Sequence, residues 1–244
     1  MNQTRPRGGR NPGLARLAFL VAAAIGCPVV AMGPAAAQTP PTAAEAARYD
    51  GLLAAAHQGR ADQVAKLLAG GAAVDVRDGH GRTQLHVATF GRHHDVVQAL
   101  AKAGADLGAL ENDRYDAVTI ASVADDEPTL RLLLSLGASA RLVTSRYDGT
   151  ALIAAAHLGH DGVVRQLIGA GAPLDHVNNL HWTALLEAII LGDGGSNHRQ
   201  IVELLVKAGA NVDLADGNGS FFATLQNAKE PLIIVGQGAL ARPD

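Results

Sequence analysis

The chain has 244 residues, enough for one ordinary domain and a targeting segment, and its formal net charge is −3. Hydrophobic residues make up 48 % of it and aromatic residues only 3 %, so alanine, leucine, valine and glycine must form the core. Small side chains favour thin stacked layers over one large globular centre, and the balance of charge argues against a nucleic-acid binder.

The first 37 residues have the three-part pattern of a secretory signal peptide. Four arginines precede an apolar run over residues 17–25, and the sequence Ala35-Ala36-Ala37-Gln38 is typical of a cleavage site. The apolar run is shorter than the roughly 20 residues that a membrane-spanning helix needs. We therefore expect cleavage after Ala37 and export to the periplasm. Lipid attachment at Cys27 and full secretion are the alternatives.

Cleavage after Ala37 would change the charge of the chain, because the first acidic residue is Glu45. The shortened chain would hold 16 basic and 23 acidic residues, a net charge of −7, which is unfavourable for binding nucleic acid. It would also lose Cys27, the only cysteine, and with it any disulfide. We expect residues 38–47 to be a linker between the leader and the folded domain.

A hexad recurs along the rest of the chain, most clearly as Thr83-Gln84-Leu85-His86-Val87-Ala88. Related hexads begin at Asp50, Asp116, Thr150 and Thr183, so that successive starts lie 33, 33, 34 and 33 residues apart. Threonine and aspartate are good N-caps, and each hexad therefore predicts the start of a helix.

A second motif follows each hexad, with apolar residues spaced to form one face of a second helix, as in Val163-Val164-x-x-Leu167-Ile168. A glycine-alanine pair then ends each unit, as at Gly104-Ala105, where glycine can stop a helix. A polar segment such as residues 75–81 leads on to the next hexad, and we call such a segment a finger.

The hexad resembles the ankyrin pattern T-P-L-H-x-A, from which Thr83–Ala88 departs only at the proline, and the period is similar to that of ankyrin repeats. The resemblance implies an all-α ankyrin-repeat solenoid of five helix-turn-helix repeats with β-finger loops and a degenerate C-terminal cap. The expected repeats are 48–80, 81–113, 114–147, 148–180, 181–217 and a partial one at 218–226, followed by a tail at 227–244.

The repeats depart from the pattern in three places. The third repeat lacks the threonine and histidine, and Pro128 stands in the first turn of its second helix, where proline is tolerated. The fifth repeat has a glycine-rich insertion over residues 192–197, which we interpret as a flexible loop. The apolar segment 231–235 lacks the polar outer face of an ordinary cap.

No motif for metal, dinucleotide or nucleophilic chemistry occurs in the sequence. The resemblance implies that His86 and His160 stand where ankyrin repeats place histidine for structural hydrogen bonds. We therefore expect no catalytic residues, no cofactor and no metal, and we expect that the protein is not an enzyme.

Binding is expected on the concave side of the solenoid, where the fingers and first helices repeat. Arginine, tyrosine and tryptophan are enriched in binding hot spots. Packing against a neighbouring finger is the alternative role for Trp182. The residues expected to contact a partner are Arg77, His80, Arg82, Arg114, Tyr115, Arg146, Tyr147, His181 and Trp182.

The segment from Trp182 to Ala188, with the glycine-rich insertion after it, resembles the small exported ankyrin-repeat proteins of bacteria. That resemblance implies a monomeric periplasmic adaptor that binds a protein, with no nucleic acid and no membrane once the leader is removed. The alternatives are an immunity-type protein that neutralises a toxin and a secreted effector that binds a host protein. The fold does not choose among these partners.

Overall fold

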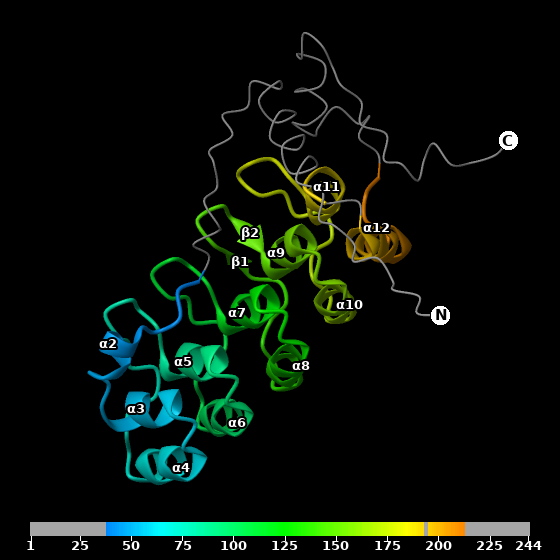
Figure 1. The fold of residues 1–244 in the computed structure, drawn as a ribbon. Helices are drawn as coiled ribbons and strands as arrows, with labels where there is room; N and C mark the ends of the chain where they lie inside the picture. Colours follow the sequence, from blue (N-terminus) through cyan, green and yellow to red (C-terminus); the bar gives the residue numbers. More distant parts are fainter. Residues whose placement is uncertain (1–37, 193–194, 213–244) are drawn as a thin grey trace, which may run out of the picture.

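The computed structural model describes residues 38–192 and 195–212 as a curved stack of helix pairs (Figure 1). The expected all-α ankyrin-repeat solenoid is confirmed, and two short strands lie in one of its fingers. The elements are α2 (Ala43–Ala46), α3 (Gly51–His57), α4 (Ala61–Ala69), α5 (Gln84–Phe90), α6 (His94–Lys102), α7 (Ala117–Val123), α8 (Glu127–Ser135), β1 (Val143–Thr144), β2 (Gly149–Thr150), α9 (Ala151–Leu158), α10 (Asp161–Gly169), α11 (Ala184–Ile190) and α12 (Ser196–Ala208).

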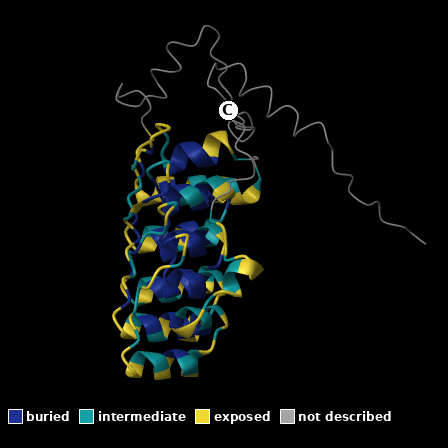
Figure 2. Cartoon of the chain, turned by 90° about the vertical axis from the view of Figure 1, so that its left-hand side faces the viewer, coloured by how far each residue is buried: buried dark blue, intermediate teal, exposed yellow. Residues whose placement is uncertain are grey.

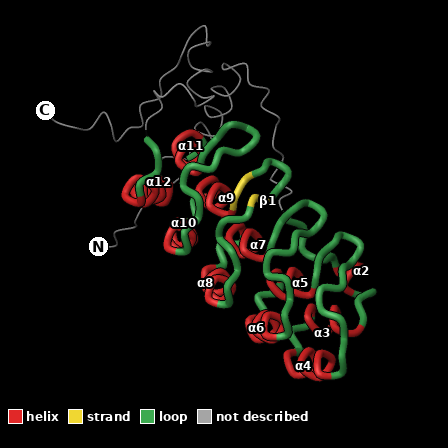
Figure 3. The backbone as a smooth tube through the Cα atoms, turned by 180° about the vertical axis from the view of Figure 1, so that it is seen from behind, coloured by secondary structure: helices red, strands yellow, loops and turns green. Residues whose placement is uncertain are grey.

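The helices form two layers. The first helices of the repeats, α3, α5, α7, α9 and α11, pack side by side in chain order, and the second helices α4, α6, α8, α10 and α12 do the same. The fingers run along one edge of the first layer (Figures 1 and 3). Each repeat thus covers its neighbour, which is how a unit too small to fold alone obtains a core.

Local chemistry sets the ends of the helices where the motifs predict them. The side chains of Asp116, Thr150 and Thr183 each accept a hydrogen bond from a backbone N–H three residues on, which caps α7, α9 and α11. The glycines of the five glycine-alanine pairs all have φ between +76° and +97°, a left-handed conformation that stops a helix. Pro128 lies in the first turn of α8, as expected.

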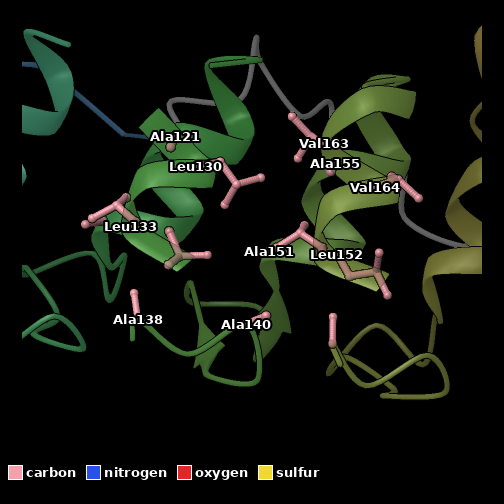
Figure 4. Packing of buried hydrophobic residues seen from close by; sticks show 14 of the residues in the cluster. Ala121, Leu130, Leu133, Ala138, Ala140, Ala151, Leu152, Ala155, Val163 and Val164 are labelled. Atoms are coloured by element: carbon pink, nitrogen blue, oxygen red, sulfur yellow. The ribbon is translucent and has the colours of Figure 1, made fainter. Parts of the chain in front are cut away.

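The core consists of alanines with larger apolar residues such as Leu85, Ile120 and Leu152 on the first helices, and mainly of leucines and valines on the second helices. The helices α5 and α7 are buried along almost their whole length (Figure 2). Figure 4 shows Leu130 and Leu133 of one pair beside Leu152 and Val164 of the next, within one cluster of buried residues. The alanines of the hexads leave room for the first helices to approach closely, which suits a stack of thin layers.

One position of the first helices carries a different kind of residue in the last of them, α11. The residue six positions after the start of the hexad is small and buried in the first four repeats, where it is Ala56, Thr89, Ser122 or Ala156. In α11 it is Ile189, which is 53 % exposed.

The segment expected as a linker, residues 38–47, contains helix α2 and lies against the first finger. Arg82 donates hydrogen bonds to the Thr39 carbonyl oxygen and to Glu45, both at 3.0 Å. Ser196 and Asn197, expected in a flexible loop, belong to α12. The leader 1–37, the partial repeat 218–226 and the tail 227–244 lie outside the described residues.

None of the helices in the described part of the chain is both long enough and apolar enough to cross a membrane.

Candidate partner-binding surface

Four fingers lie side by side along the first helices, and we call their solvent-facing side the finger surface. They are finger 1 (73–82), finger 2 (106–115), finger 3 (139–149) and finger 4 (173–182).

One backbone hydrogen bond joins each finger to the next, at corresponding positions between fingers 1 and 2 and between fingers 3 and 4, and shifted by one residue between fingers 2 and 3. The Asn112 N–H donates to the His80 carbonyl oxygen at 3.0 Å, and the Ser145 N–H donates to that of Arg114 at 2.9 Å. The Asn179 N–H donates to that of Tyr147 at 2.9 Å. The fingers therefore form one continuous surface rather than four separate loops.

Side chains at the base of each finger fix its shape. In finger 1, Oδ1 of Asp78 accepts from the N–H groups of His80 and Arg82 at 2.9 and 3.0 Å. In finger 4, Oδ1 of Asn178 accepts from those of Leu180 and Trp182 at 3.0 and 2.9 Å. Such turns order the finger tips before any partner arrives, which lowers the entropy lost on binding.

The structure exposes five of the nine residues expected to contact a partner. They are Arg77, His80, Arg114, Arg146 and His181. Tyr147 and Trp182 are half-buried, and so each still presents part of its ring to solvent.

Arg82 was expected on the surface, and this expectation is corrected: its side chain is only 2 % exposed. Its guanidinium pairs with Asp78 at 2.7 Å and with Glu45 at 3.0 Å. The backbone N–H of Thr42 and the guanidinium of Arg82 lower the pKa of Glu45 to about 2. A buried charge must be paired, and Arg82 therefore joins the N-terminal segment to finger 1 instead of reaching a partner.

The expectation that Tyr115 contacts a partner is also corrected, because Tyr115 is only 7 % exposed. Burial raises the pKa of its hydroxyl. Its carbonyl oxygen accepts a hydrogen bond at 3.1 Å from Nε2 of His86, which is itself buried and whose pKa burial lowers to about 4. Tyr115 is therefore a buried residue of finger 2 and not a surface contact.

The exposed arginines form ion pairs or hydrogen bonds with residues of the neighbouring fingers. Arg114 pairs with Asp148 at 3.2 Å, and Arg146 pairs with Asp113 at 2.9 Å. Arg77 donates to the carbonyl oxygen of Leu110 at 2.6 Å. Exposed ion pairs of this kind contribute about 0–1 kcal/mol to stability. A carboxylate of the partner can therefore take the place of Asp148 or Asp113 beside the arginine at little cost in stability.

Sequence reasoning missed the aliphatic residues of the finger surface. Leu180 of finger 4 is 47 % exposed. Others of the same kind are Val76, Val143 and Val177. They lie in the fingers, outside both apolar helix motifs, but this place alone does not identify them, because other apolar finger residues such as Tyr115 are buried.

Five histidines of the stack lie within hydrogen-bond distance of a backbone carbonyl oxygen. His160 Nδ1 lies 3.0 Å from the Ser122 carbonyl oxygen, and His93 Nε2 lies 3.0 Å from that of His57. Among the residues that the structure describes, no three of histidine, cysteine, aspartate and glutamate are placed to hold a metal ion.

The comparisons with known proteins agree with this architecture. A family model described as ankyrin repeats in three copies matches residues 52–144 and 118–216. The ankyrin repeat protein YahD of Escherichia coli K12 is 35 % identical over 168 residues, covering 68 % of this chain and 83 % of that protein. The crystal structure of an ankyrin repeat domain from Acinetobacter baumannii AYE is 46 % identical, with a TM-score of 0.64, covering 69 % of this chain and 85 % of that one.

Proposed function

The chain belongs to the ankyrin-repeat family, and we propose that it is a non-catalytic scaffold that binds one protein partner through the finger surface. Ankyrin repeats generally mediate protein–protein interactions and are typically not catalytic. The observation that carries the proposal is the continuous finger surface, which bears both exposed arginines and exposed aliphatic residues. Mixed surfaces of this kind suit the core and rim of a protein interface.

The place where binding occurs is proposed to be the periplasm. Support comes from the three-part pattern of residues 1–37 and the small-residue cleavage sequence at Ala35–Gln38. Fractionation of cells tests the proposal: processed protein should be released with the periplasm, and an Ala35→Arg, Ala37→Arg variant should accumulate uncut. Protein that stays in the cytosol at full length would contradict it.

The binding surface can be tested with two matched double variants. Arg114→Ala with Arg146→Ala removes two exposed, ion-paired arginines from the fingers. Arg131→Ala with Arg165→Ala removes two of the same kind from the second helices α8 and α10.

Each variant and the wild type are used as bait in a periplasmic extract. We expect the wild type and the helix variant to retain the same partner, and the finger variant to lose it or to bind it at least about tenfold more weakly. Equal retention by both variants would place the interface elsewhere. A toxin as the captured partner would identify the immunity role.

A further inference from the structure

The last helix pair of the stack exposes an apolar position that every earlier repeat covers. Three residues after the glycine of each glycine-alanine pair stands an apolar residue, and in the first four repeats it belongs to the core or packs against it. These four residues are Val74, Leu107, Ala140 and Leu174. The residue at the same position after α12 is Val212, which is 60 % exposed. No repeat follows α12 among the described residues, so this stacking position has nothing on it.

Two further positions of the last pair are exposed in the same way. Three residues before the glycine of the pair, Leu68, Leu134 and Ile168 pack against the core, whereas Val206 of α12 is 45 % exposed. Ile189 of α11 is exposed where the first four repeats bury a small residue. We call Ile189, Val206 and Val212 the end face, which spans both helix layers at the C-terminal end of the stack (Figure 1). An exposed group of branched apolar side chains points to a further contact.

The chain leaves α12 in the direction that the earlier fingers take. The Asn211 N–H donates to Asp175 at 2.7 Å, and the Asp106 N–H donates to Asp75 at 3.0 Å. In both pairs the donor lies two residues after the glycine of its own repeat, and the acceptor lies four residues after that of the repeat before. A fifth finger therefore begins beside finger 4 as finger 2 begins beside finger 1, and a chain that continues in this way returns to the end face.

The sequence after Val212 keeps the spacing of the repeats. Each hexad begins 12 or 13 residues after the glycine of the preceding pair, and the residue 12 positions after Gly209 is Phe221. The residue 14 positions after the start of a hexad is buried in each of the first four repeats, as Val64, Val97, Leu130 and Val164. Counted from Phe221 this residue is Val235, and the apolar residues 232–234 precede it. Apolar residues thus recur at positions that belong to both helix layers.

The residues of this segment also suit the shape of the end face. Phe221 and Phe222, two of the four phenylalanines in the chain, stand where the other units have an N-cap followed in most cases by glycine or alanine. Ile189 holds an element packed on α11 further away than a small residue would, and large side chains fill a wider space. Gly238 stands where the first four repeats have a leucine, 17 positions after the start, so the segment is shorter than a full repeat.

We propose that residues 221–235 cover the end face, with Phe221 and Phe222 on Ile189 of α11 and with residues 232–235 on Val206 of α12. The cover extends beyond the expected partial repeat, 218–226, into the expected tail. It is joined to the face by its own chain, so its local concentration is high and no partner is needed. The finger surface remains free, and the inference is therefore independent of the proposed function.

Thiol labelling tests the cover in protein expressed from the full-length gene. With Cys27→Ser as the background, an introduced cysteine is the only one in the chain. Val206→Cys places the thiol on the end face, and Val177→Cys places one on finger 4 at a valine of similar exposure, 51 %. Each rate of reaction with a maleimide is divided by the rate of the same variant in urea, which removes differences in intrinsic reactivity. We expect Val206→Cys to react at least about tenfold more slowly than Val177→Cys.

Two double substitutions in the Val206→Cys protein identify the segment that covers the thiol. Phe222→Ser with Ile234→Ser removes apolar contacts, and the labelling rate should rise to that of Val177→Cys. Lys229→Ser with Gln237→Ser changes two polar residues of the same part of the chain, and labelling should stay slow.

Equal rates for Val206→Cys and Val177→Cys would overturn the proposal, because the end face would then be open to solvent. Slow labelling that the Phe222 and Ile234 substitutions leave unchanged would overturn it as well. If that slow rate rose on dilution, the cover would be a second copy of the chain.

Discussion

The hydroxyl of Tyr49 donates a 2.6 Å hydrogen bond to Oδ2 of Asp78, and this bond ties the segment before α3 to finger 1. Burial alone would raise the pKa of Asp78, but hydrogen bonds from Tyr49 and Arg82 outweigh it and lower that pKa. Asp78 is thus the centre of a buried polar network, in which each member needs the others.

Asp78→Ala should therefore be among the most damaging single substitutions in the fingers. It leaves the buried Arg82 with one partner fewer and Tyr49 without an acceptor, and we expect the free energy of unfolding to fall by about 3 kcal/mol. Asp113→Ala breaks the exposed pair with Arg146 and should cost less than about 1 kcal/mol. Urea unfolding of both variants measures the difference, and equal losses would contradict the network.

Acid should destabilise the protein in a window set by His86. Its pKa is lowered to about 4 in the folded state, so the unfolded state binds the proton first. The stabilisation by neutral His86 is present above its ordinary pKa near 6.5 and is lost as pH falls from there toward 4, up to about 3 kcal/mol. The free energy of unfolding at pH 7 and pH 4.5 should differ less in His86→Gln than in the wild type. An unchanged slope in the variant would assign the acid sensitivity to other groups.

The two finger tyrosines should respond differently to truncation. Tyr115 is buried, so Tyr115→Ala leaves a cavity and should lower the free energy of unfolding by about 3–4 kcal/mol. Tyr147 is half-buried, and Tyr147→Ala should cost about 1 kcal/mol. Chemical denaturation of both variants checks the ranking, and the opposite order would mean that Tyr115 is not a core residue in solution.

Two glycines of finger 1 form another matched pair. Gly81 has φ of +74°, and a Cβ there would clash with Asn112 of finger 2. Gly81→Ala should therefore destabilise by about 1–2 kcal/mol. Gly79→Ala meets nothing within 4 Å and should change the melting temperature little. A neutral Gly81→Ala would indicate that the fingers separate more easily than their hydrogen bonds suggest.

The spacing of the hexads was enough to predict the helical repeats, because an N-cap such as Thr183 and a helix-stopping glycine such as Gly104 act through local backbone chemistry. Burial in the fingers was not predictable in this way. Whether Tyr115 points into the core or into solvent depends on the neighbouring repeat, and its residue type is common in both places.

The burial of Arg82 was not predicted, for a related reason. Its partner Glu45 lies 37 residues earlier, in a segment whose composition suggested a linker. In the sequence, Gln84 appears only as a departure from the proline of the ankyrin pattern. That its side chain is buried, with no donor to its Oε1 among the described residues, could not be predicted.

Ile189 limits how this array can grow. Duplication of an inner repeat would join surfaces that carry small residues such as Ala156 or Ser122, and the copies could stack at the existing spacing. A repeat stacked on α11 would have to accommodate a branched isoleucine at this position, where the inner repeats carry a small residue. Lengthening by duplication should therefore be better tolerated between inner repeats than next to α11.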